Sequence, residues 1–120
     1  MKVPNYEQAI VPKEKLTEYL LNFEHIDGKS KALFYQKYGF EKENFEDLIV
    51  SLKKIISEND FDNCNETPWG KKYVVFGYLF SVRQPPPMVK TVWQIKKDDD
   101  FPRLITAYPE KKLKLISNEK

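Results

Sequence analysis

The segment Phe45-Glu-Asp-Leu-Ile-Val-Ser-Leu-Lys-Lys-Ile-Ile-Ser-Glu58 decides the fold class. Its apolar residues recur at the spacing of one face of an amphipathic helix. They are Phe45, Leu48, Ile49, Leu52, Ile55 and Ile56. Asn44 is suited to cap this helix, and Asp47 adds a negative charge in the first turn, where the helix dipole favours it. The sequence therefore predicts a helix over 45–58 with one face directed at a core.

Two further helices are predicted before this one. The first covers 12–22, since proline suits the first turn of a helix and the apolar residues after it share one face. The second covers 30–38, with Ser30 as its N-cap. We expect 1–12 to form an extended arm, in which 6–11 adds a short strand.

After Gly70 the pattern changes to that of strands, rich in Val, Tyr and Phe. Strands are predicted over 72–82, 88–96 and 103–108, with a fourth edge strand through Leu113, Leu115 and Ile116. A polar connection over 59–70 precedes them. Short turns between the strands make the sheet antiparallel. This order predicts one α+β domain over 1–120, with three N-terminal helices packed on a C-terminal antiparallel sheet of three or four strands.

Composition narrows the class of protein. With 120 residues the chain has room for one core, and 41% hydrophobic with 32% charged residues is typical of a soluble globular domain. A net charge of +2 is too small to indicate a nucleic-acid partner by itself. Cys64 is the only cysteine, which favours a reducing compartment. Without an apolar run long enough to span a bilayer, we expect a cytoplasmic protein, or a domain cut from a longer chain, that has no membrane partner.

The polar segment Leu20–Ala32 contains the first candidate functional residues. It holds the only histidine, His25, together with Lys29 and Lys31. An imidazole beside fixed cations is suited to moving a proton near a phosphate. The same residues also suit a capping histidine and two solvated lysines at the start of a helix. Gly-Lys-Ser is present at 28–30, but the earlier glycine and the preceding strand of a phosphate-binding P-loop are absent, which excludes nucleotide hydrolysis.

The predicted strands supply further candidates. Side chains alternate along a strand, so Thr91 shares a face with Val89 and Trp93, and Thr106 shares a face with Leu104 and Tyr108. We expect Thr91 and Thr106 to lie close together on neighbouring strands, with Tyr108 near them. Their hydroxyls would either form a cross-strand pair or line an open site.

The remaining polar residues fit fewer roles. Arg83 and Arg103 are the only arginines, and each fits either a phosphate clamp or an ordinary surface position. Cys64 lacks a partner histidine at a known spacing, so a thiol nucleophile is not expected. No cluster has metal-ligand spacing, so we predict no metal and no cofactor. Trp69 is a residue on which a base could stack, whereas Trp93 is expected in the core.

Several segments resemble one family. They are Lys2–Asn5, Lys15–Asn22, His25–Ala32, Thr91–Trp93 and Pro102–Pro109. Together they look like a small bacterial domain family of unknown function, over about residues 1–109. Similar domains occur alone and at the C-terminal ends of toxin-like proteins. The resemblance implies a toxin-related context but no particular activity.

The order of helices and then antiparallel strands is more distantly similar to the barnase, EndoU, colicin and RelE ribonuclease superfamily. This resemblance implies a metal-independent ribonuclease-like site that acts on RNA and leaves DNA uncut. The implied catalytic residues are His25, Lys29, Arg103, Thr106 and Tyr108, and the implied substrate-binding residues are Lys31, Arg83 and Thr91. The alternative is a non-catalytic module that binds a small neighbouring protein.

Overall fold

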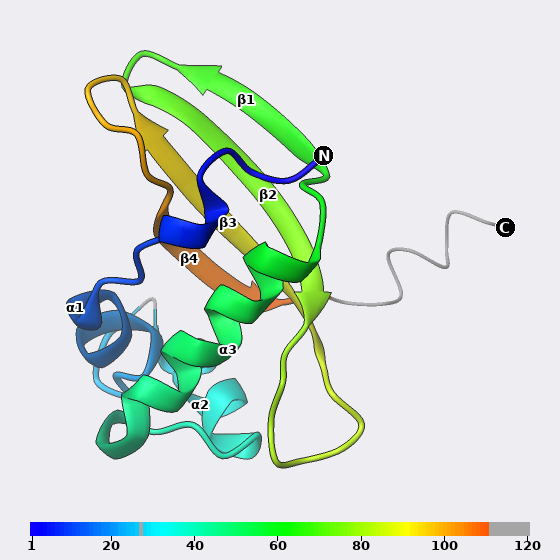
Figure 1. Cartoon of the computed structure of the whole chain (residues 1–120). Coiled ribbons are helices and arrows are strands. Elements are labelled where there is room, and N and C mark those ends of the chain that lie inside the picture. Colours follow the sequence, from blue (N-terminus) through cyan, green and yellow to red (C-terminus); the bar gives the residue numbers. More distant parts are fainter. Residues whose placement is uncertain (27, 111–120) are drawn as a thin grey trace, which may run out of the picture.

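The computed structural model describes residues 1–26 and 28–110 (Figure 1). Its helical elements are η1 (Tyr6–Gln8), α1 (Lys13–Lys15), η2 (Leu16–Leu20), α2 (Lys29–Lys37), η3 (Lys42–Asn44) and α3 (Phe45–Glu58). Its strands are β1 (Asn63–Thr67), β2 (Gly70–Tyr78), β3 (Met88–Lys96) and β4 (Arg103–Pro109). The strands form one antiparallel sheet in the order β1-β2-β3-β4. The α+β class and the antiparallel sheet are therefore confirmed.

Helix α3 crosses one face of the sheet (Figure 1). The apolar stripe that the sequence predicts is the face it buries, and Leu48, Leu52, Ile55 and Ile56 are all fully enclosed. Close approach to β2 depends on Gly77, because a Cβ atom there would lie 2.9 Å from the Ile55 side chain. The helix and the sheet thus share one core, which leaves the opposite face of the sheet without a helix from the described residues.

The continuous segment α1–η2 and helix α2 lie beside the edge strand β4 rather than across the sheet (Figure 1). The helix predicted over 12–22 is a single α-helical turn, α1, that continues as the π-helical segment η2. Helix α2 begins after Gly28 instead of at a capping Ser30. Tyr35 on α2 is fully buried and donates a hydrogen bond of 2.6 Å to the Ala107 carbonyl of β4. Burial raises the pKa of Tyr35, so its phenol stays protonated and holds α2 at this edge.

A β-bulge between β3 and β4 changes which residues of β4 face the core. Val92 pairs with Thr106, whereas Trp93 pairs with Leu104, so Ile105 is the extra residue. Leu104 and Ala107 are both buried as a result. The prediction that Leu104 and Thr106 share a face is therefore wrong, because strict alternation fails where a residue is inserted.

Three other local predictions differ from the structure. The polar connection predicted over 59–70 contains β1, an edge strand whose side chains are almost all exposed. Instead of a strand over 6–11, the N-terminal arm forms η1 and then one parallel bridge between Ile10 and Arg103. The strand predicted over 72–82 is β2 and ends at Tyr78. The strand predicted at 113–116 lies outside the described residues.

Candidate functional site

His25 lies in the turn that leads into α2. The backbone N–H of Gly28 donates a hydrogen bond of 3.1 Å to His25 Nδ1. A side chain at position 28 is excluded, because a Cβ atom there would lie 2.3 Å from the Tyr19 carbonyl oxygen. Since Nδ1 accepts this bond, the neutral ring carries its proton on Nε2. The turn therefore positions the imidazole and favours the tautomer that carries its proton on Nε2.

Aromatic and cationic side chains connect His25 to the sheet. The ring of Tyr19 meets the His25 ring edge-on, with centroids 5.0 Å apart. The Lys31 ammonium lies 5.2 Å from the centroid of Tyr19 and 5.7 Å from that of Tyr108. Lys90 on β3 lies 5.6 Å from the centroid of Tyr108. The three ammonium-to-ring distances are within cation–π range. We call these five residues the helix–sheet cluster.

The helix–sheet cluster joins residues from four elements of the fold. Tyr19 comes from η2, Lys31 from the first turns of α2, and Tyr108 with Lys90 from a cross-strand pair. Lys31 precedes Tyr35 by one helical turn, so both side chains lie on the side of α2 that meets β4. Lys31 can reach Tyr108 because Tyr35 anchors α2 at the β4 edge.

Two shallow hollows flank this cluster. One, of about 440 Å³, is lined by Ser30, Lys31, Tyr108 and Pro109. The other, of about 460 Å³, is lined by Pro12, Glu14, Lys15, Glu18, Tyr19 and His25. The first combines a cation, two hydroxyls and the N-terminal turn of α2, a set of groups that suits an anion such as phosphate. The second hollow places the His25 imidazole beside the carboxylates of Glu14 and Glu18 and the ammonium of Lys15.

Thr106 lies on the same face as Tyr108, roughly 7 Å along β4. Its Oγ1 is buried and has no hydrogen-bond partner among the described residues. Buried hydroxyls usually have a partner, so this atom is a polar group next to the cluster that a ligand or water would satisfy.

Three predicted cationic residues lie outside the cluster. Arg103 begins β4, roughly 17 Å along the strand from Tyr108, and its guanidinium is 3.9 Å from Asp99. Arg83 is exposed in the β2–β3 loop. Lys29 is exposed at the start of α2. No described interaction ties Arg83 or Lys29 to the cluster.

Thr91 belongs to the core and not to an open site. It pairs with Ala107 on the face opposite Thr106, so the expected proximity of the two threonines is wrong. Its hydroxyl donates to the Val75 carbonyl at 2.7 Å and accepts the indole N–H of Trp93 at 2.8 Å. The β4 bulge causes the error, because it moves Thr106 to the other face.

Replacing Thr91 with Val is expected to lower the free energy of unfolding by about 1–3 kcal/mol, because the buried Trp93 N–H loses its acceptor. Any RNA cleavage measured in the folded fraction should be unchanged. Thermal denaturation checks the first statement, and Thr91→Ser, which keeps the hydroxyl, should lose much less stability. A Thr91→Val protein as stable as the wild type would contradict the hydrogen-bonding role.

Among residues 1–26 and 28–110, no group of three or more His, Cys, Asp or Glu side chains is placed to hold a metal ion. Within that same part of the chain, no helix has the length and apolar character to cross a membrane.

Comparison with known proteins identifies the family. The model of the family described as Domain of unknown function (DUF6883) matches residues 2–111. The chain belongs to this family. One solved structure with a similar fold is titled a contact-dependent growth inhibition toxin–immunity protein complex from Klebsiella pneumoniae 342. The alignment has a TM-score of 0.66 and 12% identity, and covers 89% of this chain and 97% of the other. At this identity the likeness shows a shared fold. Among the curated proteins, none matches.

Two members of the helix–sheet cluster, Tyr19 and Lys90, were not predicted as site residues from the sequence. Tyr19 carries the helical spacing of a core residue, and nothing local marks its contact with His25. For Lys90 the sequence gives only a weak indication of a functional role. Alternation along β3 places its side chain on the face opposite Thr91. Only the register between β3 and β4 places it opposite Tyr108.

Proposed function

We propose that this domain is a toxin-related, metal-independent, ribonuclease-like domain that acts on RNA at the helix–sheet cluster. One observation carries the proposal. The Lys31 ammonium lies between the rings of Tyr19 and Tyr108, and so joins the histidine segment to the sheet. An imidazole, a phosphate-binding cation and a phenol are thereby assembled from sequence-distant segments.

The phosphate would bind in the hollow beside Lys31. The Lys31 and Lys90 ammonium groups would stabilise the charge that develops on the oxygens bound to phosphorus. Ser30, in the first turn of α2, adds a hydroxyl and the positive end of the helix dipole. Tyr108 would orient the phosphate or donate a proton through its phenol. In this proposal Lys90 would stabilise that charge in place of Lys29 and Arg103, which the resemblance to the ribonuclease superfamily implied as catalytic residues.

His25 would act as the general base for attack of the 2′-hydroxyl on the adjacent phosphate. This attack forms a 2′,3′-cyclic phosphate as the bond between phosphorus and the 5′-oxygen breaks, and the departing 5′-oxygen takes a proton from the Tyr108 phenol or from water. To accept a proton at Nε2, the ring must first carry its own proton at Nδ1, which breaks the bond from the Gly28 N–H. A hydrogen bond of this kind contributes about 1 kcal/mol. This cost is small beside the 10²–10⁴-fold, or about 3–5 kcal/mol, that general base catalysis supplies. DNA lacks the 2′-hydroxyl and should stay intact.

Two comparisons support the toxin-related part of the proposal. The similar solved structure is named as a complex of a growth inhibition toxin and an immunity protein. The order of helical elements followed by an antiparallel sheet is also that of the barnase, EndoU, colicin and RelE superfamily.

The proposal is tested by cleavage of end-labelled RNA with EDTA present. The wild-type protein should cleave, and His25→Ala should lower the rate by about 10²–10⁴-fold, because it removes the general base. His25→Asn is the matched variant, since an Asn side chain can also accept the Gly28 N–H and preserve the turn. Its activity should fall as far as that of His25→Ala.

The outcomes distinguish a catalytic role of His25 from a role in holding the turn before α2. Full activity in His25→Asn with loss in His25→Ala would show that His25 only holds the turn, which overturns its role as base. Equal cleavage in all three proteins, or cleavage by none across many RNAs, would overturn the ribonuclease assignment.

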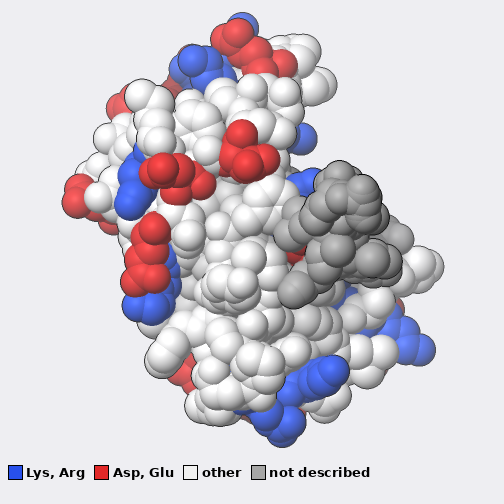
Figure 2. All heavy atoms as spheres, turned by 90° about the vertical axis from the view of Figure 1, so that its right-hand side faces the viewer, with Lys and Arg blue, Asp and Glu red and all other residues white. Residues whose placement is uncertain are grey.

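A second candidate function, binding a small protein partner, is favoured by one surface. Val50, Phe80 and Val82 are 62%, 61% and 88% exposed around a hollow that Ser51 also lines. Figure 2, seen from the right-hand side of Figure 1, shows a broad area without charged side chains in the middle of that face. Recovery of a stoichiometric protein partner from the native host, together with no cleavage of RNA, would favour this function over the first.

A further inference from the structure

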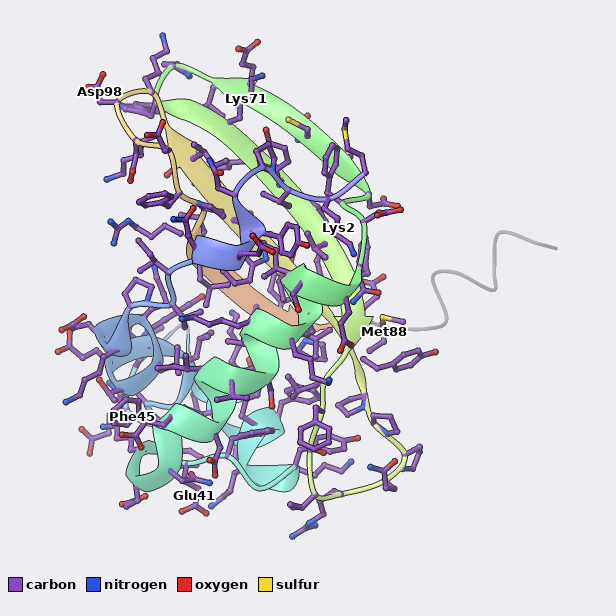
Figure 3. The ribbon with its side chains drawn as sticks, viewed as in Figure 1. Lys2, Glu41, Phe45, Lys71, Met88 and Asp98 are labelled. Carbon is purple, nitrogen blue, oxygen red and sulfur yellow. The ribbon has the colours of Figure 1, made fainter. Side chains whose placement is uncertain are left out.

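The turns at one end of the sheet display an exposed tryptophan. Figure 3 shows Lys71 and Asp98 at this end, with Met88 at the opposite end. The Lys97 N–H donates to the Trp69 carbonyl at 3.0 Å, which ties the β3–β4 turn to the β1–β2 turn. The Trp69 N–H in turn donates to Thr67 Oγ1 at 3.2 Å. The backbone of Trp69 is held on both sides while its side chain is 70% exposed.

Beside Trp69 lies a hollow of about 770 Å³, within the size range of small-ligand sites. Its lining includes Ile105 and Gln94. Ile105 is the extra residue of the bulge, and the insertion directs its side chain away from the core. The hollow thus combines an indole ring, an aliphatic surface and an amide that can both donate and accept hydrogen bonds.

The charges that line this hollow are mostly positive. Lys72, Lys96 and Lys97 supply three cations, while Asp98 and Asp99 supply two carboxylates. Asp99 is already engaged, because its Oδ1 accepts the Asp100 N–H at 2.8 Å and its Oδ2 is 3.9 Å from the Arg103 guanidinium. The positive charge of the three lysines therefore exceeds the negative charge of the remaining carboxylate, that of Asp98. This balance favours a ligand that carries negative charge.

We infer that this hollow binds an unpaired base of single-stranded RNA, stacked on Trp69, with its flanking phosphates on the lysines. Exposed aromatic rings between cations are the recurring basis of single-strand binding, because every base has a face that can stack. A double helix hides those faces, so the ring selects an unpaired base. Gln94 is placed to hydrogen-bond the edge of that base.

This inference rests on the proposed function and adds a second contact to it. Gln94 and Lys90 lie on the same face of β3, roughly 13 Å apart along the strand. One RNA strand running along this face could therefore contact both the Trp69 hollow and the helix–sheet cluster. The Trp69 hollow would hold a base several nucleotides from the phosphate that is cleaved.

Tryptophan fluorescence tests the stacking directly, since the only other tryptophan, Trp93, is fully buried. The probe is a single-stranded RNA of about 12 nucleotides with 2′-O-methyl groups, which lacks the nucleophile and is not cleaved. We expect saturable quenching of the wild-type emission. In Trp69→Ala the affinity, measured by anisotropy of a labelled probe, should fall about 5- to 100-fold. Trp69→Phe keeps a ring on which a base can stack and should retain most of the wild-type affinity for the probe.

The results distinguish this inference from the proposed function. Equal affinity in Trp69→Ala and the wild type, or equal competition by a duplex of the same sequence, would overturn the stacking site. If His25-dependent cleavage persisted in that case, the proposed function would stand without it. Conversely, Trp69-dependent binding of the methylated RNA without cleavage of ordinary RNA would support the site and overturn the ribonuclease.

Discussion

Replacing Leu52 with Asp is expected to unfold the domain. Leu52 is fully buried in the core that α3 shares with the sheet. Losing its apolar side chain costs about 2–5 kcal/mol. Burying a carboxyl group without a partner adds several more. The sum is comparable with the whole stability of a small domain, about 5–15 kcal/mol. Circular dichroism should show loss of the native spectrum and of a cooperative thermal transition.

Val50→Asp is the matched control for this variant. It lies two positions earlier on α3, but its side chain is 62% exposed. The same new charge should therefore leave the fold and the melting temperature nearly unchanged. A Leu52→Asp protein with a normal spectrum and the wild-type melting temperature would contradict the packing of α3 on the sheet.

Replacing Lys31 with Ala is expected to lower the rate of RNA cleavage by about 10²–10³-fold, because it removes a charge directed at the transition state. The fold should survive, since Tyr35 still anchors α2 to the Ala107 carbonyl. Binding of the methylated RNA should weaken much less, because a group that acts in the transition state affects catalysis more than binding. Single-turnover cleavage and anisotropy measure the two effects separately.

Two variants control for the loss of a lysine. Lys31→Arg keeps the cation between Tyr19 and Tyr108 and should keep part of the activity. Lys53→Ala removes an exposed charge from α3 and should leave the rate unchanged. Cleavage by Lys31→Ala at the wild-type rate would remove Lys31 from the mechanism and with it the main support for the helix–sheet cluster.

Elements with a strong local pattern were predicted closely. The helix over 45–58 and the strand over 88–96 have the same bounds in the structure. Both patterns are written in consecutive residues, because burial of one face imposes a period of 3.6 on a helix and of 2 on a strand. Trp93 was likewise correctly expected in the core.

Elements without such a pattern were missed or misread. The side chains of β1 are almost all exposed, so no alternation marks it, and its strand character comes from pairing with β2. The bulge at Ile105 depends on the register between β3 and β4. It overturned the predicted proximity of Thr91 and Thr106, since one inserted residue reverses the faces that follow it.

The sequence by itself determined the α+β class, the principal helix and strands, and a set of candidate residues that included His25, Lys31 and Tyr108. Only the tertiary structure decided which candidates meet. It joined those three through Tyr19 and Lys90, sent Thr91 to the core and left Arg103 at the other end of β4. The physical reason is that period and composition are local, whereas a site depends on strand register and on the docking of α2 at a sheet edge.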